Sequence, residues 1–119
     1  EYYLRKYGLF DKIDKKSILI TPLKTYDEFI FLLANCKYLI ADGGSIQEES
    51  LVFKKPCLVL RNRTERQEGL KTGINFLTMD VKKAKEIIKS LDNNKIKIQP
   101  FKNPYGKPGL SKKIIEILR

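Results

Sequence analysis

Short apolar runs alternate with amphipathic stretches along the chain, and this alternation restricts the possible folds more than any other feature. Four runs have the length of buried strands: Ser17–Ile20, Tyr38–Ala41, Cys57–Leu60 and the weaker Ile74–Thr78. Strands buried on both faces are typical of parallel sheets, whose crossover connections are right-handed. The sequence therefore predicts an α/β fold with a Rossmann-like parallel sheet and flanking helices.

The stretches between these runs have helical periodicity. Thr25–Asn35 places apolar residues on one face, and Thr25 with Glu28 three positions later forms a capping-box pattern. Ser45–Phe53 has Ile46, Leu51 and Val52 as its apolar residues. Two further helices are predicted over Val81–Leu91 and over Leu110–Leu118, the second after the breaker-rich segment 103–109.

Composition excludes several classes of function. The 119 residues are enough for one domain, and because the chain contains no His, it has no His-based catalytic dyad or His-ligated metal site. We expect no metal and no cofactor. The apolar runs are too short to cross a bilayer. The net charge of +10 fits anion binding, but the lysines are spread singly or in pairs without a nucleic-acid-binding motif, so nucleic acid is not the expected partner.

Cys36 and Cys57 lie in apolar surroundings, without the spacing of a zinc site or the density of a disulfide scaffold. They predict buried thiols in a reducing, cytoplasmic compartment. Because the first residue is Glu1 and not Met, we expect the chain to be a fragment or to lack its start.

The turn Asp42-Gly43-Gly44-Ser45 connects a predicted strand to a predicted helix. Paired glycines let the backbone approach a ligand, and the open N–H groups of a helix start attract an anion, so the turn is a candidate phosphate cradle. Taken alone, the glycines fit better a tight turn that needs only their torsional freedom. Gln47, Glu48 and Glu49 follow. A glutamate carboxylate here either accepts hydrogen bonds from sugar hydroxyls or simply complements the helix dipole.

The next predicted strand leads into a charged segment over residues 61–69, which includes Arg61, Arg63, Arg66 and two glutamates. Ligands bind at the carboxyl ends of strands in sheets of this class, which is where this segment begins. Guanidinium groups suit diphosphate oxygens, and glutamates can fix the orientation of the arginines. A salt-bridged loop in solvent is the alternative.

Several motifs in order decide between these alternatives: Asp-Gly-Gly-Ser-Ile-Gln-Glu-Glu-Ser at 42–50, Lys-Pro-Cys-Leu-Val-Leu-Arg at 55–61, Thr-Glu-Arg-Gln-Glu-Gly at 64–69 and Asn-Pro-Tyr-Gly at 103–106. Together they resemble the non-hydrolysing UDP-N-acetylglucosamine 2-epimerase family, from about Ile18 to the C-terminus. The usual family loop is Asp-Ser-Gly-Gly. Here the serine stands two places later, which leaves the backbone cradle as the part of the pattern that is kept.

The resemblance implies two Rossmann-like domains of the glycosyltransferase-B type, with this chain as part of the second. The first domain, with the catalytic acids and the family's His-containing motifs, would lie upstream of Glu1. In the family-type strand order, two upstream strands would separate Ser17–Ile20 from Tyr38–Ala41, while the last three predicted strands are neighbours. A fragment would either close that gap or expose an apolar sheet edge and associate.

The resemblance also assigns roles to single residues. The Asp42–Ser45 loop, with Gly43, Gly44 and Ser45, would hold the diphosphate of a UDP-sugar. Glu49 would bind the ribose hydroxyls, Arg61 and Arg66 the anionic end, and Phe29 would lie near the uracil. Gln47 would also be a substrate-binding residue. No position matches a catalytic acid or base. We expect the full-length protein to be a homodimer.

The implied activity is interconversion of UDP-N-acetylglucosamine and UDP-N-acetylmannosamine, with this chain binding UDP and inactive alone. A glycosyltransferase of the same overall fold is a second interpretation. A binding remnant without activity, or a basic nucleic-acid-binding module, is a third from a different class. An epimerisation assay without acceptor separates the first two, and titration with UDP or a random oligonucleotide tests the third.

Overall fold

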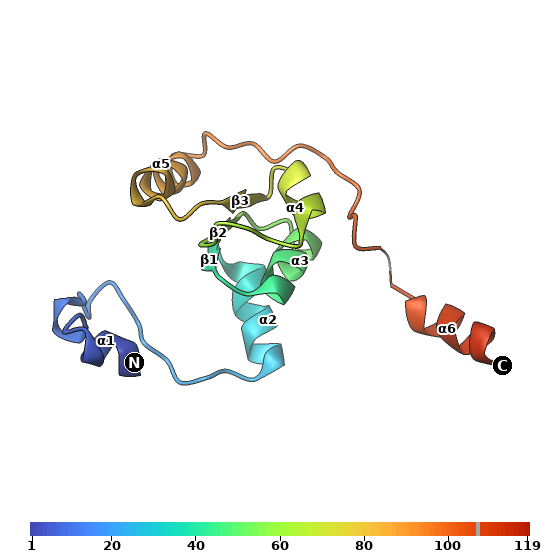
Figure 1. Ribbon diagram of the computed structural model, residues 1–119, viewed down its shortest axis with the longest axis horizontal. Coiled ribbons are helices and arrows are strands. Elements are labelled where there is room, and N and C mark those ends of the chain that lie inside the picture. The colour runs from blue at the N-terminus through green and yellow to red at the C-terminus, as the bar shows by residue number, and fades with distance from the viewer. Residues whose placement is uncertain (107) are drawn as a thin grey trace.

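The computed structural model describes residues 1–106 and 108–119; Lys107, in the predicted breaker-rich segment, lies outside them. A small sheet stands at the centre, with helices on either side of it and at both ends of the chain (Figure 1). The elements in order are α1 (Tyr2–Lys6), η1 (Phe10–Lys12), α2 (Tyr26–Asn35), β1 (Leu39–Ala41), α3 (Gly44–Val52), β2 (Cys57–Val59), α4 (Gln67–Lys71), β3 (Asn75–Leu77), α5 (Val81–Asp92) and α6 (Leu110–Leu118).

The sheet has three parallel strands in the order β1-β2-β3. Ile40 is paired with Leu58, and Leu58 with Phe76. This confirms that the last three predicted strands are parallel neighbours. All three residues of β2 are buried, because this strand has a neighbour on each edge and helices over both faces. Strong burial on both faces is what a continuous apolar run predicts.

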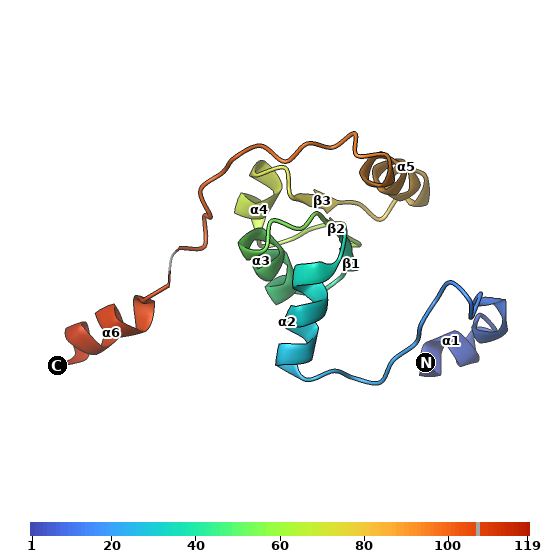
Figure 2. The ribbon, with the colours of Figure 1, turned by 180° about the vertical axis from the view of Figure 1, so that it is seen from behind.

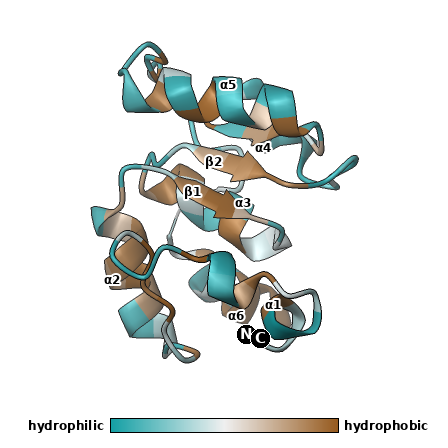
Figure 3. Cartoon of the chain, turned by 90° about the vertical axis from the view of Figure 1, so that its left-hand side faces the viewer, coloured by the Kyte–Doolittle hydropathy of each residue, from teal (hydrophilic) through white to brown (hydrophobic). Residues whose placement is uncertain are grey.

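Helices cover the two faces of the sheet unequally. Figures 1 and 3 place α5 on the opposite side of the strands from α2. On the α5 side, Ile40 and Leu58 line a cavity of about 360 Å³ together with Ala84 and Ile88 of α5. On the other side, Leu33 of α2 and Leu51 of α3 are almost fully buried. The core is therefore thin, and it is centred on β2.

Capping residues set the starts of two helices as the sequence predicts. Thr25 and Glu28 form the predicted capping box at α2, where the Thr25 N–H donates to Glu28 Oε2 over 3.0 Å. At α5, Asp80 Oδ1 accepts a hydrogen bond of 2.9 Å from the N–H of Lys83. α6 has the predicted bounds, whereas α3 begins at Gly44, one residue before the predicted start.

The prediction of a strand over Ser17–Ile20 is wrong. These residues belong to no strand, and Leu19 is 87% exposed. The segment between η1 and α2 runs apart from the sheet (Figure 1), so its backbone has no strand beside it to pair with. Of the two outcomes expected for a gap beside β1, an open apolar edge is the one observed, since Ile40 is 51% exposed. Association through that edge remains a prediction.

Both ends of the chain extend away from the sheet. Figure 2 shows α1 and α6 at opposite ends of the molecule. The radius of gyration is 17.0 Å, against about 13.5 Å for a compact chain of this length. α6 exposes much of its apolar face, with Ile117 and Leu118 each at least 80% exposed. Over residues 1–106 and 108–119, none of the helices combines the length and the apolar character that crossing a membrane requires.

Candidate functional site

The candidate site lies at the carboxyl ends of β1 and β2. The chain leaves β1 through Asp42 and Gly43 and enters α3 at Gly44, and it leaves β2 through residues 60–66 before α4. Gly43 is the N-cap of α3 and makes no side-chain cap, so the first N–H groups of a nine-residue helix are left free of a capping side chain. Ser45, the second residue of α3, is exposed.

Neither glycine of this turn uses a positive φ, and Gly44 allows a close approach by the loop after β2. Gly43 has φ −74°, and Gly44 is the first residue of α3 and has no positive φ. A Cβ on Gly44 would lie 3.0 Å from Glu65 Oε1 and 3.6 Å from Arg66 Cζ. The alternative of a glycine-dependent tight turn is therefore wrong here. At Gly44 the ends of the Glu65 and Arg66 side chains, from the loop after β2, lie next to the space that a Cβ would fill.

Alternating charges connect the glycine turn to that loop. Arg61 Nε lies 2.8 Å from Asp42 Oδ1, and Arg66 Nε lies 2.7 Å from Glu48 Oε1. Glu65 bridges the two arginines, with its carboxylate oxygens 3.4 Å from one guanidinium and 2.8 Å from the other. Because these groups are largely exposed, solvent screening makes the pairs a small source of stability. Their effect is to aim both guanidinium groups.

Two of these charged groups, Arg66 and Glu65, have pKa values that their hydrogen bonds and ion pairs shift toward the charged form. The hydrogen bond from Arg66 to Glu48 raises the pKa of the Arg66 guanidinium, and the nearby Glu65 adds to this rise. The pKa of Glu65 is lowered by a backbone hydrogen bond and by the charges of Arg66 and Arg61. The site therefore presents two fixed cations beside an open helix start.

Glu49 lies one turn further along α3 and faces α2. Its Oε1 accepts a hydrogen bond of 3.1 Å from the Tyr26 hydroxyl, and this bond raises the pKa of Tyr26. Its Oε2 is buried without a hydrogen-bond partner among the described residues. The Phe29 ring lies 6.4 Å from the Tyr26 ring, one helical turn along. Tyr26 therefore lies between Phe29 and Glu49 and contacts both of them. Tyr26 and Glu49 also line a cavity of about 470 Å³.

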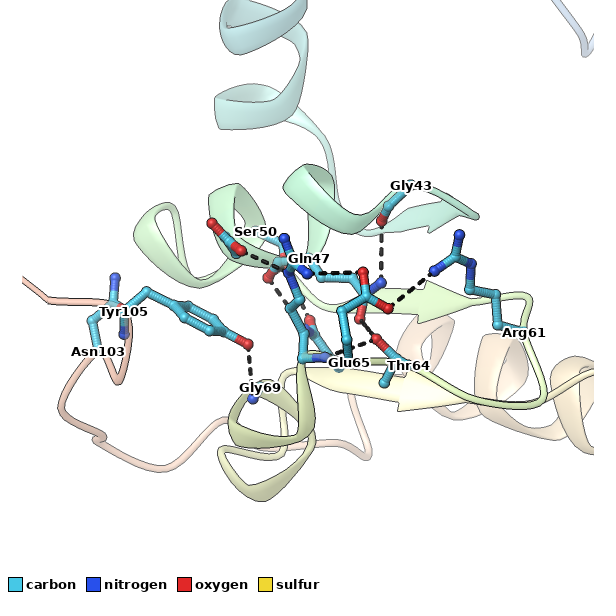
Figure 4. Close-up of polar contacts among 12 residues, drawn as sticks. Gly43, Gln47, Ser50, Arg61, Thr64, Glu65, Gly69, Asn103 and Tyr105 are labelled. Atoms are coloured by element: carbon cyan, nitrogen blue, oxygen red, sulfur yellow. Dashed lines mark hydrogen bonds and ion pairs between the residues drawn. The ribbon is translucent and has the colours of Figure 1, made fainter.

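Gln47 lies inside the protein. It is 0% exposed, and both polar atoms of its amide have partners: Nε2 donates to the Gly43 carbonyl over 3.1 Å, and Oε1 accepts from the Thr64 hydroxyl over 2.8 Å. Figure 4 shows this amide between the glycine turn and the loop after β2. The structure thus places Gln47 behind the site instead of on its surface.

The Asn103–Gly106 motif reaches the same region from the C-terminal part of the chain. The Tyr105 hydroxyl accepts a hydrogen bond of 3.2 Å from the Gly69 N–H, and Tyr105 N–H donates to Asn103 Oδ1 over 3.0 Å (Figure 4). Burial raises the pKa of Tyr105. A segment more than thirty residues away in sequence thus closes one side of the site.

The structure divides the eight predicted residues between three places. Gly43, Gly44, Ser45, Arg61 and Arg66 lie at the glycine turn and in the loop over residues 60–66, here called the arginine loop. Glu49 and Phe29 lie on α3 and α2 on either side of Tyr26, and Gln47 is buried. Three residues of this region are not marked as site residues by the sequence: Tyr26, an aromatic residue at the start of α2, and Thr64 and Asn75, which are buried polar residues. A polar residue within a buried apolar strand run was the available signal for Asn75. In the described part of the chain, no three acidic or cysteine side chains gather as a metal site requires.

Comparison with known proteins identifies the family of this chain. The family model for UDP-N-acetylglucosamine 2-epimerase matches residues 5–119. The UDP-N-acetylglucosamine 2-epimerase of Methanocaldococcus jannaschii is 37% identical over 97% of this chain and 31% of its own length. That of Campylobacter jejuni is 38% identical over 84% of this chain and 27% of its own. The chain thus spans about a third of the length of these curated relatives.

Solved structures of UDP-GlcNAc 2-epimerases have the same fold as this chain. The crystal structure of the Methanocaldococcus jannaschii enzyme in complex with UDP-GlcNAc and UDP superposes with a TM-score of 0.85 at 34% identity, covering 98% of this chain and 32% of that one. The Neisseria meningitidis UDP-GlcNAc 2-epimerase bound to UDP-GlcNAc gives 0.75 at 28% identity, over 99% and 33% of the two chains.

Proposed function

The chain belongs to the UDP-N-acetylglucosamine 2-epimerase family, and from this premise we propose that it is the UDP-binding part of an enzyme that interconverts UDP-N-acetylglucosamine and UDP-N-acetylmannosamine. The observation that carries the proposal is the approach of the arginine loop to Gly44, where a Cβ would meet both Glu65 and Arg66. The Arg66 guanidinium thereby lies against the open helix start, and Asp42 holds the Arg61 guanidinium beside the same turn, an arrangement that suits a diphosphate.

In this proposal the diphosphate lies at the N-terminus of α3. The backbone of Gly43, Gly44 and Ser45 supplies N–H donors, and Arg61 and Arg66 supply the charge. Glu65 is the present partner of both arginines, so the anion binds by replacing its carboxylate. Exchange of one anionic partner for another keeps the guanidinium groups paired throughout.

The nucleoside lies toward α2. The buried, unpartnered Oε2 of Glu49 supports a role as acceptor for the ribose hydroxyls, since a carboxylate oxygen in that state favours a donor. Phe29 offers an aromatic face for the uracil on the same side. The distance between the two subsites is set by α3, which carries the diphosphate donors at its start and Glu49 one turn later.

The reaction follows from what the family does. The C2 proton of the sugar is removed and UDP leaves, which gives a glycal; UDP then adds back after the proton returns on the other face. This chain would hold UDP while it is detached. The bases and acids for the proton steps are assigned to the rest of the full-length enzyme.

We further propose that residues 1–119 form part of the second domain of a glycosyltransferase-B-type fold, with the catalytic domain elsewhere in the protein. We also propose that the full-length protein is a homodimer. The free thiols of Cys36 and Cys57 support placing it in the reducing cytoplasm.

The test is an assay of the full-length protein with UDP-N-acetylglucosamine and no acceptor, followed by chromatography of the nucleotide sugars. Appearance of UDP-N-acetylmannosamine supports the proposal. Release of UDP only when a sugar acceptor is added would support a glycosyltransferase instead. UDP binding without either reaction would leave a binding protein.

A further inference from the structure

A continuous chain of hydrogen bonds joins the glycine turn to the arginine loop through the protein interior. It runs from the Gly43 carbonyl to Gln47 Nε2 at 3.1 Å, and from Gln47 Oε1 to the Thr64 hydroxyl at 2.8 Å. It ends where the Thr64 hydroxyl oxygen accepts from the Arg66 N–H at 3.1 Å. The glycine turn and the arginine loop are thus joined by buried hydrogen bonds, in addition to the ion pairs between them (Figure 4).

Every donor and acceptor in this chain has a single consistent role. The Gly43 carbonyl can only accept, so it must face the amide nitrogen of Gln47, and the amide oxygen then faces Thr64. The Thr64 hydroxyl accepts from Arg66 and so has its own proton available for Gln47. Reversing any one group would place two acceptors together.

The middle of the chain is anchored to the sheet. Asn75 of β3 donates from Nδ2 to the Gln47 carbonyl over 3.1 Å, and the Ser50 hydroxyl lies 2.9 Å from the same oxygen. Gln47 is 0% and Thr64 is 5% exposed. Buried polar groups that are fully satisfied restrict a structure to one arrangement, because any other arrangement leaves a group unpaired.

We propose that Gln47 and Thr64 are positioning residues that fix the arginine loop at its distance from the helix start and so preform the diphosphate subsite. The inference rests on the proposed function, and it assigns Gln47 a role without ligand contact. Its consequence is selective: the pair acts on the phosphate half of the ligand, whereas the nucleoside half depends on Glu49 and α2.

The experiment compares UDP and uridine binding to variants of the full-length protein, with UDP followed by calorimetry and uridine by ligand-observed NMR. Thr64→Val keeps the side-chain shape and removes the hydroxyl. We expect UDP affinity to fall at least about tenfold, as for loss of a buried bond and the partners it leaves unpaired. Uridine affinity should stay within about twofold, and Thr64→Ser should recover most of the UDP affinity.

Thr78→Val is the matched control. Thr78 is buried to a similar degree, 7% against 5% exposed, and its hydroxyl accepts from the N–H two residues later, Asp80, over 3.0 Å, as Thr64 does from Arg66. It lies between β3 and α5, and its hydroxyl has no hydrogen bond to Gln47 or Arg66 among the described residues. We expect Thr78→Val to lower the unfolding temperature while UDP affinity is retained.

Three results would contradict the inference. These are wild-type UDP affinity in a folded Thr64→Val protein, an equal loss of UDP and uridine binding, and loss of UDP binding in Thr78→Val as well. Gln47→Met, which keeps the side-chain length, repeats the test if Thr64→Val does not fold. If the wild-type protein binds no UDP, the proposed function fails and this inference with it, whereas wild-type binding with unaffected variants removes this inference alone.

Discussion

The hydroxyl of Tyr26 donates to Oε1 of Glu49 over 3.1 Å, which ties the first turn of α2 to the middle of α3. Glu49 keeps its second oxygen buried and without a partner among the described residues. The hydrogen bond therefore holds one carboxylate oxygen, and the other is the oxygen that we propose as the acceptor for a ligand hydroxyl.

Tyr26→Phe in the full-length protein should weaken UDP binding by about two- to tenfold, because Glu49 loses the donor that fixes its rotamer. Calorimetric titration measures this. Tyr3→Phe is the control, since Tyr3 is a 66% exposed residue of α1, which lies apart from α3. Equal UDP affinities for Tyr26→Phe and the wild-type protein would show that Glu49 does not depend on Tyr26.

Gly69→Ala should destabilise the full-length protein. A Cβ at this position would lie 2.5 Å from Nδ2 of Asn75, so Asn75 has to give up its place against Gln47. Overpacking of this kind costs about 1–3 kcal/mol. Thermal unfolding should show a lower transition temperature than for Lys71→Ala, an exposed site on the same helix. Matching transitions for the two variants would contradict the close packing at Gly69.

Cys57 should resist alkylation while the protein is folded. Burial raises the pKa of its thiol to about 11, and the residue is 0% exposed. At pH 8 about one thiol in a thousand would be ionised, and the thiolate is the reactive form. Cys36 is only partly buried. Peptide mapping after iodoacetamide treatment should find Cys36 modified first, and faster modification of Cys57 would contradict a central β2.

The 119-residue chain should show no epimerase turnover by itself. Proton abstraction needs a base whose pKa lies near the working pH. The chain has no His, and Glu65, one of the site carboxylates, has its pKa lowered. Chromatography of UDP-N-acetylglucosamine incubated with the chain measures turnover. Any turnover that is abolished by a substitution within residues 1–119 would place a catalytic group here.

Local signals predicted those parts of the fold whose causes are local. The capping box of α2 and the continuous apolar run of β2 are examples, since both depend on neighbouring residues in sequence. The Ser17–Ile20 run has the composition of a strand but forms no strand. A strand also needs a neighbour to pair with, and composition does not report one.

The orientation of α3 shows why the site could be predicted only in part. Its apolar residues are Ile46, Leu51 and Val52, but they do not define its buried side, because Val52 is 62% exposed. The buried face is instead Gln47, Ser50 and Leu51, at helical spacing. Gln47 and Ser50 can be buried because Thr64 and Asn75 satisfy them, and those partners are 17 and 25 residues away along the chain.

The central claim is that the proposed site binds UDP. Titration of the full-length protein and its site variants with UDP tests this claim most directly. Glu49 and Arg61 both lie at the proposed site, whereas Lys85 is an exposed residue of α5. Glu49→Ala and Arg61→Ala should each lose about 1.5–3 kcal/mol, or about ten- to a hundredfold in affinity. Lys85→Ala should change affinity by well under about 1 kcal/mol at physiological salt. If calorimetry shows the three variants binding UDP alike, the assignment of the site is wrong even though the fold stands.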